Sequence, residues 1–219
     1  MFIPLHDENP TLRFPAVTVV LVAVNIAVFT LGAFSPQGIQ QSVQTFGAVP
    51  YAVTHFLSVT LPGAGVPPLL TLLTSLFIHG SLLHVLGNML YLWIFGNNIE
   101  DVLGPFRFIL FYFACGLAAS LTQIVATPSS RVPMVGASGA IAGVLGAYWV
   151  LFPRARVETL IFVFVVPVPA GVVLGLWFIL QLLSAGLGGG VAWFAHIGGF
   201  LAGVGLVLAA VRRRRRSVR

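Results

Sequence analysis

One serine, one asparagine and three histidines occur inside or beside segments whose other residues are almost all apolar. They are His79, His84, Asn88, Ser138 and His196. Serine and histidine are the residue types of nucleophilic catalysis, because an imidazole can take the hydroxyl proton as the oxygen attacks a carbonyl. The N–H groups of amides can stabilise the oxyanion that forms. These residue types therefore suit acyl-transfer chemistry wherever the fold gathers them in one place.

Four of these side chains share one depth in their segments, namely His84, Asn88, Ser138 and His196. At ~1.5 Å per residue, each lies roughly 18–24 Å from the nearest charged or boundary residue on one membrane side. A hydrocarbon core is about 30 Å thick, so this layer is near the opposite face and within reach of water. A single membrane serine or asparagine usually makes an interhelical hydrogen bond, and a single histidine is as often structural as functional. Their common depth favours one constellation.

The residues around Ser138 predict a helix start. Ser138 follows Pro133 and Gly136, and proline favours the first helical position. Amides in a first helical turn have no intrahelical acceptor and can bind a developing oxyanion. A helix over residues 136–152 would be only about 25 Å long, slightly short of a full span. We therefore expect the loop before it to dip inward and to create a cavity above the serine.

Two glycine pairs predict that the helices carrying Ser138 and His196 pack closely. Gly139 and Gly143 have the small-x-x-x-small spacing, and so do Gly199 and Gly203. This spacing lets two membrane helices approach backbone to backbone. Ser138 adjoins the first pair and His196 lies one turn before the second, so the contact would bring the two side chains together.

The composition shows what kind of elements must position these groups. Of the 219 residues, 58% are hydrophobic and only 7% are charged, and the mean hydropathy is +1.02. Soluble domains contain about 25% charged residues, so this chain is an integral membrane protein. We expect a single membrane domain over residues 1–219 with short ends. Cys115 is the only cysteine, which excludes an intrachain disulfide.

Four charge-free stretches set the number of spans, which we predict to be six transmembrane helices in an all-α polytopic fold. The expected spans are 14–34, about 81–98, 105–126, 136–152, about 170–185 and about 191–211. Prolines and glycines break up residues 35–80, so we expect a long interfacial loop there rather than a straight helix. Gly186–Gly190 marks the turn between the last two spans.

The distribution of arginines orients these spans. If both termini are cytoplasmic, every basic residue except Arg131 is cytoplasmic, as the positive-inside rule requires. We therefore expect a cytoplasmic N-terminus over residues 1–13 and a basic cytoplasmic tail over residues 212–219. The Arg212–Arg216 run is then the flank of the last span, compatible with contact to anionic lipid, and not a nucleic-acid site.

In this topology all five carboxylates are cytoplasmic, which excludes several chemistries at depth. An aspartyl protease needs two carboxylates, and a zinc protease needs a helical His-Glu-x-x-His; neither pattern exists within the spans. A Ser-His-Asp triad is excluded as well. His196 would have no acidic partner, so the site must be a dyad that helix packing holds in place.

The polar residues, taken in chain order, resemble the three signature motifs of rhomboid proteases. The motifs are His84-x-x-x-Asn88, Gly136-x-Ser138-Gly139 and Ala195-His196-x-x-Gly199-x-x-x-Gly203, with His79-x-x-x-x-His84 extending the first. The long uncharged connection before the second span is similar to the family's first loop. Each motif is weak alone, and the ordered set is specific.

The resemblance implies a Ser-His dyad that cleaves transmembrane or juxtamembrane segments of single-pass proteins, with product release to the outer side. Ser138 would attack the scissile carbonyl, and His196 would take its proton and return it to the leaving amine. His84, Asn88 and the Ser138 amide would form the oxyanion hole. Four further residues would support the site: His79, Gly136, Gly139 and Gly199. No cofactor and no metal ion is implied, and the partners are transmembrane substrates and membrane lipid, not nucleic acid.

Two departures from the family pattern concern how the site is held. Many members have a Trp-Arg pair early in the first loop, where this chain has Leu70–Thr71. Many also have a tyrosine one turn after the serine that packs against the histidine, where this chain has Ala142. Another aromatic residue would have to take that place beside His196.

Two other functions are compatible with parts of the pattern. A catalytically inactive rhomboid-like protein would bind or chaperone membrane segments, but such proteins usually lose the serine or the histidine. A small transporter would carry polar residues through the full membrane depth, whereas here they occupy one layer. The short ends fit a compact prokaryotic enzyme of the plasma or inner membrane, with its active site open to the outer side.

Overall fold

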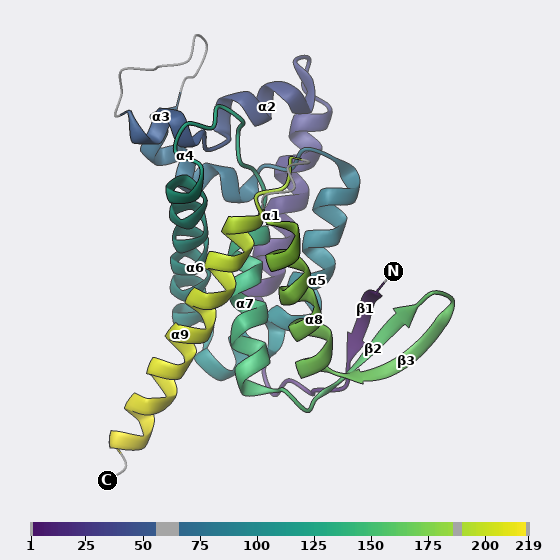
Figure 1. The fold of residues 1–219 in the computed structure, drawn as a ribbon. Helices are drawn as coiled ribbons and strands as arrows, with labels where there is room; N and C mark the ends of the chain where they lie inside the picture. The colour runs from purple at the N-terminus through teal and green to yellow at the C-terminus, as the bar shows by residue number, and fades with distance from the viewer. Residues whose placement is uncertain (1, 56–65, 186–189, 218–219) are drawn as a thin grey trace.

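The structure is a computed structural model that describes residues 2–55, 66–185 and 190–217. It is predominantly helical (Figure 1). The helices are α1 (Ala16–Ala33), α2 (Gly38–Phe46), α3 (Pro50–Thr54), α4 (Pro68–Thr74), the 3-10 turn η1 (Ser75–Phe77), α5 (Leu82–Leu103), α6 (Pro105–Ala126), α7 (Ser138–Leu151), α8 (Ala170–Ser184) and α9 (Trp193–Ser217).

Several of these helices are long and apolar enough to cross a membrane. Three pass on their own, namely α1, α6 and the part of α9 up to Ala210. The helices α4 and α5 pass together but are bent by 78° between Phe77 and Leu82. The apolar helices α7 and α8 are shorter, with 14 and 15 residues. The prediction of a helical, multi-pass membrane protein is therefore confirmed.

The connection expected over residues 35–80 contains short helices. Among its described residues are α2, α3, α4 and η1, and Pro50 and Pro68 each start one of them. An antiparallel bridge between Ala48 and Met134 ties this region to the loop before α7. Residues 56–65 lie outside the described part of the chain, as do residues 186–189 of the turn expected at Gly186–Gly190.

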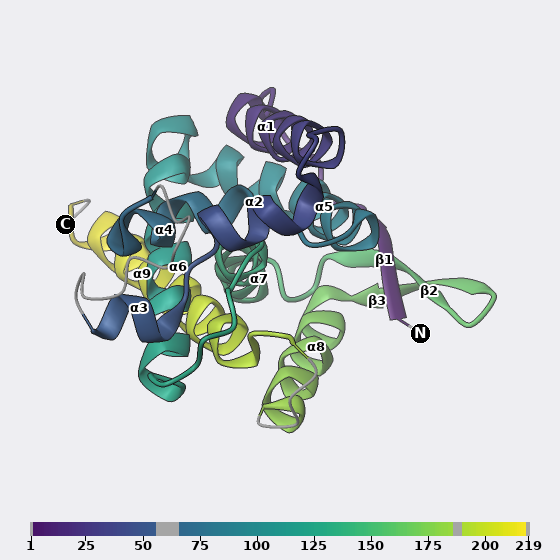
Figure 2. The same ribbon diagram turned by 90° about the horizontal axis from the view of Figure 1, so that it is seen from above.

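The short helix α7 forms the centre of the bundle (Figure 2). All residues from Gly139 to Tyr148 are buried. The glycine pairs meet as expected: a Cβ added at Gly199 would overlap the carbonyl oxygen of Gly139, and one at Gly203 would overlap that of Gly143. The close α7–α9 packing predicted from the spacing is therefore confirmed.

A small three-stranded antiparallel sheet accompanies the helical bundle and was not expected from the sequence. Its strands, in spatial order, are β1 (Phe2–Asp7), β2 (Arg156–Ile161) and β3 (Phe164–Pro169). The hairpin β2–β3 follows the end of α7 opposite Ser138 and leads directly into α8. The first residues of the chain thus form a strand, where the sequence indicated only a short polar end.

Three carboxylates, of which Asp7 and Glu100 are buried, lie at the same end of the bundle as this sheet. Glu100, which is 3% exposed, accepts hydrogen bonds from Val17 N (2.9 Å), Thr18 N (2.7 Å) and Thr18 Oγ1 (2.8 Å). It therefore caps the first turn of α1, which has no side-chain cap of its own. Asp7 accepts from Tyr148 Oη at 2.6 Å, and Asp101 accepts from Leu12 N at 3.0 Å.

We call Asp7, Glu100 and Asp101 with these donors the carboxylate cluster. Burial raises the pKa of Asp7 above its ordinary value, although the Tyr148 hydroxyl opposes the shift by hydrogen bonding to the carboxylate. The cluster fixes the chain segment before α1 to the far ends of α5 and α7.

Candidate active site

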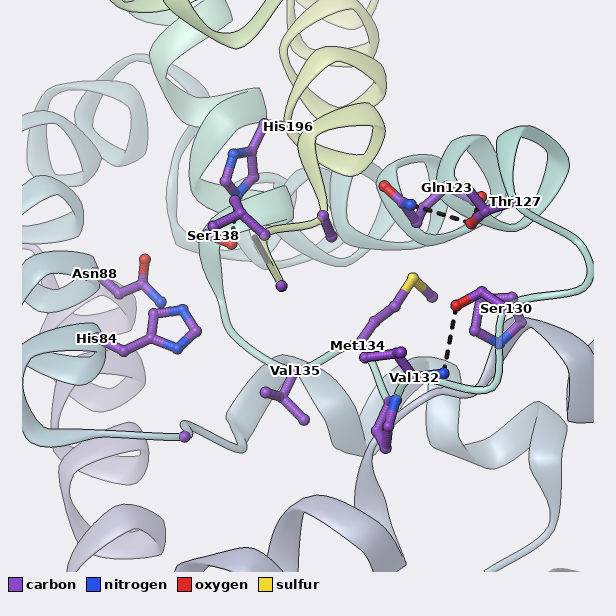
Figure 3. Close-up of a pocket in the computed structure, with 16 residues that line it drawn as sticks. His84, Asn88, Gln123, Thr127, Ser130, Val132, Met134, Val135, Ser138 and His196 are labelled. Atoms are coloured by element: carbon purple, nitrogen blue, oxygen red, sulfur yellow. Dashed lines mark hydrogen bonds between the residues drawn. The ribbon is translucent and has the colours of Figure 1, made fainter. Parts of the chain in front are cut away.

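A cavity of about 550 Å³ lies at the N-terminal end of α7 (Figure 3). Its walls come from α5, α6, the loop before α7, and the start of α9. Polar side chains among the lining residues are His84, Asn88, Gln123, Thr127, Ser130, Ser138 and His196. Residues 132–135 of the loop before α7 line the cavity, and Ala137 at the end of this loop is fully buried.

Ser138 and His196 are in direct contact at the wall of this cavity. The Oγ atom of Ser138 lies 2.8 Å from Nε2 of His196, although the residues are 58 positions apart. Ser138 is the first residue of α7, and the first helical hydrogen bond runs from Ile141 N to Ala137 O. The amides of the first turn therefore have no intrahelical acceptor and are free to bind an anion.

Gly136, rather than Pro133, sets the start of this helix. Its φ of +120° is rarely adopted by residues with a side chain, and it turns the loop into α7. A Cβ on Gly136 would also lie 2.8 Å from His84 Nε2. Pro133 lies five residues before Ser138, too far away to be the first helical residue.

The other ring nitrogen of His196 has a neutral partner. Nδ1 of His196 lies 2.7 Å from Oε1 of Gln181, a residue of α8 that is only 7% exposed. Gln181 Nε2 donates to Trp177 O at 3.3 Å, which turns the amide oxygen toward the imidazole. An amide oxygen only accepts hydrogen bonds, so Nδ1 carries the proton and Nε2 can accept one from the Ser138 hydroxyl.

Aromatic rings surround the same imidazole. The ring of Trp177 lies 5.9 Å from that of His196, centroid to centroid, and the ring of Trp193 lies 6.2 Å away at a right angle. Ala142 is fully buried in α7. The aromatic contact that the family pattern places on the serine's helix comes from α8 and α9 in this chain.

Asn88 and the two other histidines form a second group in the site. Asn88 Nδ2 lies 2.9 Å from His79 Nε2, and the rings of His79 and His84 are 5.0 Å apart. With the amide donating to His79, one N–H of Asn88 is left for a ligand. A Cβ on Gly136 would lie 3.5 Å from Asn88 Nδ2 and close to His84, so both side chains converge on the loop that leads to Ser138.

Gln123 of α6 holds the start of α9 beside the cavity. Its Oε1 accepts from Ala195 N at 3.2 Å, and its Nε2 donates to Thr127 Oγ1 at 3.1 Å. The same N–H, one residue before His196, also donates to Ala192 O at 3.0 Å, so Gln123 supplies a second acceptor at the first turn of α9. The loop on the opposite wall is fixed by a hydrogen bond from Gly136 N to Ser75 O at 2.9 Å.

The family model for the rhomboid domain matches residues 67–213, which include His79, His84, Asn88, Ser138, Gln181 and His196. The chain belongs to the rhomboid family. The rhomboid protein 1 of Saccharomyces cerevisiae mitochondria is 35% identical over 142 residues, covering 62% of this chain and 40% of that protein. The mitochondrial presenilin-associated rhomboid-like protein of Homo sapiens is 34% identical over 138 residues, covering 61% of this chain and 36% of that protein.

A bacterial relative is more similar over a shorter segment. The rhomboid protease GluP of Bacillus subtilis is 42% identical over 76 residues, which are 35% of this chain and 14% of that protein. The chain thus spans less than half the length of each of these three relatives.

The rhomboid fold brings together the residues that the sequence motifs singled out. Ser138 and His196 touch, Asn88 contacts His79, and Gly139 and Gly199 form the close helix contact beside them. Sequence reasoning missed Gln181, Trp177 and Gln123. A signal was present for Gln181, because it is an amide within an otherwise apolar span, and polar residues there are costly and often functional.

Proposed function

We propose that this rhomboid is an intramembrane serine endopeptidase with a Ser138–His196 dyad. The observation that carries the proposal is the 2.8 Å contact between Ser138 Oγ and His196 Nε2 at a cavity wall, beside first-turn amides that lack an intrahelical acceptor. Nucleophile, base and anion-binding amides are then within reach of one peptide bond.

The mechanism follows from the hydrogen-bonding roles of these groups. The Ser138 oxygen attacks the scissile carbonyl carbon while its proton passes to His196 Nε2. The oxyanion receives hydrogen bonds from the Ser138 amide, from Asn88 and from His84. His196 then gives the proton to the leaving amine, and a water molecule that enters the cavity hydrolyses the acyl-enzyme by the same route.

Gln181 acts as a positioning residue for the base. Its oxygen keeps the Nδ1–H tautomer of His196 and fixes the ring plane, which is the orienting role that an acid has in a triad. It does so without a charge, and a neutral amide costs far less to bury at this depth than a carboxylate.

The remaining features of the proposal concern the membrane. We propose six spans, with α7 and α8 as short ones, both termini cytoplasmic, and the cavity open to the outer side. The carboxylate cluster at the bundle end opposite Ser138 supports this orientation. The substrates are transmembrane or juxtamembrane segments of single-pass proteins, and the compartment is a plasma or inner membrane.

Cleavage in a defined membrane tests the function. Purified protein in liposomes receives a single-pass substrate with small, helix-destabilising residues near its outer end. We expect cleavage by the wild type and a loss of about 10³-fold or more in Ser138→Ala and in His196→Ala. A serine-hydrolase probe should label the wild type at Ser138. Equal cleavage by Ser138→Ala would overturn the proposal, and tight substrate binding without cleavage would indicate a chaperone-like rhomboid.

A further inference from the structure

The tip of the β2–β3 hairpin exposes a large apolar surface. Phe162, Val163 and Phe164 are 81%, 80% and 70% exposed, and the next two valines of β3 are also exposed. From Thr159 to Pro169 the chain has no charged residue. An uninterrupted apolar patch of this kind on a hairpin is a mark of an interaction site.

The geometry of the turn adds to this picture. Phe162 has a φ of +55°, a conformation that non-glycine residues adopt rarely and bulky ones least of all. Hairpin turns in water use asparagine, aspartate or glycine at such positions. The sequence Phe162–Val163 is therefore unfavourable for a solvated turn, and it keeps two large apolar side chains at the outermost point.

The position of the hairpin indicates which environment meets this tip. Both views show β2 and β3 projecting sideways, away from the helices, and in Figure 1 the turn lies at the height of α8 rather than beyond its end. The helix α8 lies at the edge of the bundle (Figure 2), and its apolar side chains Leu176, Leu180 and Leu183 are exposed. Exposed residues at this level of a membrane protein face lipid.

The charge distribution and the backbone of the β2–β3 hairpin both suit a position at the boundary between membrane and water. The exposed arginines Arg154 and Arg156 are at the base of the hairpin, suited to lipid phosphates, while the tip is apolar. Just after β3, Ala170 N donates to Ala155 O. In the alternating pattern of an antiparallel pair, the backbone N–H and C=O positions of the odd-numbered β3 residues therefore point away from β2, toward the free edge of the sheet. Two of them, Pro167 and Pro169, have no N–H group to leave unpaired near lipid or to offer to another strand.

We propose that the hairpin tip, residues 161–166, is a membrane anchor that enters the headgroup–acyl boundary of the leaflet nearest the carboxylate cluster. The occupant of its apolar surface is lipid, not a second copy of the chain, because the prolines block strand addition at the edge. Since β3 runs into α8 without a linker, the anchor also sets the height of the helix that carries Gln181. This inference does not depend on protease activity.

Lipid contact can be measured residue by residue. In a Cys115→Ser background, Val163→Cys at the tip and Arg154→Cys at the base are labelled with an environment-sensitive fluorophore and reconstituted into phosphatidylcholine–phosphatidylglycerol vesicles at high dilution. We expect spin-labelled lipid to quench the tip label at least about threefold more than the base label, with aqueous iodide showing the opposite order.

Controls separate the alternatives. Val165→Cys provides a second tip position, and unchanged thermal unfolding of each variant shows that the fold is retained. Equal iodide quenching at tip and base would overturn the proposal. Protection of the tip label from iodide that increases as the protein-to-lipid ratio rises would also overturn the proposal. A second copy of the chain would then be the occupant of the tip.

Discussion

The two ends of α7 carry polar groups of opposite kinds. At its first residue, Ser138 contacts His196 beside a cavity of about 550 Å³, and the groups around them are uncharged amides and imidazoles. Near its last turn, Tyr148 donates to Asp7 within the carboxylate cluster, where Glu100 receives three hydrogen bonds. One helix thus links a neutral polar layer with a charged one.

The difference lies in what is left unsatisfied. In the carboxylate cluster, each of the three acids accepts at least one hydrogen bond from the protein, so the interactions stabilise the fold. In the neutral layer, one N–H of Asn88 and the first amides of α7 have no acceptor among the hydrogen bonds of the described residues, and both Asn88 and Ser138 line the cavity. Satisfied groups hold the bundle together, whereas unsatisfied groups are available for chemistry.

Of the substitutions considered next, removal of an oxyanion donor should have the largest effect on catalysis. Asn88→Ala is expected to lower kcat by about 10²- to 10³-fold, because a developing charge loses a hydrogen bond in a dry site. The unfolding midpoint should fall only modestly, because the buried His79 Nε2 loses one hydrogen-bond partner. Cleavage rates in liposomes and thermal unfolding in detergent measure the two effects, with Asn97→Ala on the same helix as the matched control. A kcat within twofold of wild type would remove Asn88 from the oxyanion hole.

A substitution in the carboxylate cluster should instead lower stability and leave catalysis nearly unchanged. Glu100→Ala leaves two amides and a hydroxyl of the first turn of α1 without their acceptor, which should cost about 3 kcal/mol of stability. The kcat of the molecules that remain folded should stay near the wild-type value. Chemical unfolding measures the loss, and Asp101→Ala, which frees only one exposed amide, should cost much less. Equal losses in the two variants would contradict this assignment.

Substitution of the positioning residue Gln181 should have an intermediate effect on kcat. Gln181→Leu removes the acceptor from His196 Nδ1 and should lower kcat by about 30-fold, or ~2 kcal/mol, with KM nearly unchanged. Gln181→Glu restores an acceptor and should recover much of the rate of serine-hydrolase probe labelling. If Glu and Leu variants are equally slow, packing rather than the hydrogen bond explains the role of Gln181.

The smallest effect should come from the titration of Asp7. Its pKa is raised by burial, so the folded state binds this proton more tightly than the unfolded state. The resulting stabilisation is present below the ordinary value of 3.8 and disappears as the pH rises through the raised pKa. Relative to Asp7→Asn, the wild type should therefore lose stability between pH 4 and neutral pH. Unfolding curves at several pH values test this, and a difference independent of pH would contradict it.

Much of the helical framework could be predicted from charge placement and chain breakers. The span expected at 105–126 coincides with α6, because Pro105 suits a helix start and charges flank the apolar run. The sheet could not be predicted in this way. Residues 160–169 belong to a long charge-free stretch that hides strands, and the partner β1 is at the other end of the chain. Pairings across such separations have no local signal.

The site residues that belong to the sequence motifs, or that share the same membrane depth, could be predicted. Ser138 and His196 could be paired because glycine spacing brings their helices into contact. Gln181 could not be oriented, since its place beside His196 depends on the rotation of α8 about its own axis. The aromatic residue expected beside His196 exists, but Trp177 supplies it from another helix, which no spacing within the motifs indicates.

The hydrogen bond between Asp7 and Tyr148 joins residues 141 positions apart. At a synthesis rate of roughly 5–20 residues per second, the ribosome makes the tyrosine about 7 to 28 s after the aspartate. During that interval β1 has no strand to pair with and is open to chaperones and degrading enzymes. The sheet can thus close only late in biogenesis. A molecule with a closed sheet is one in which the central helix α7 has already been inserted.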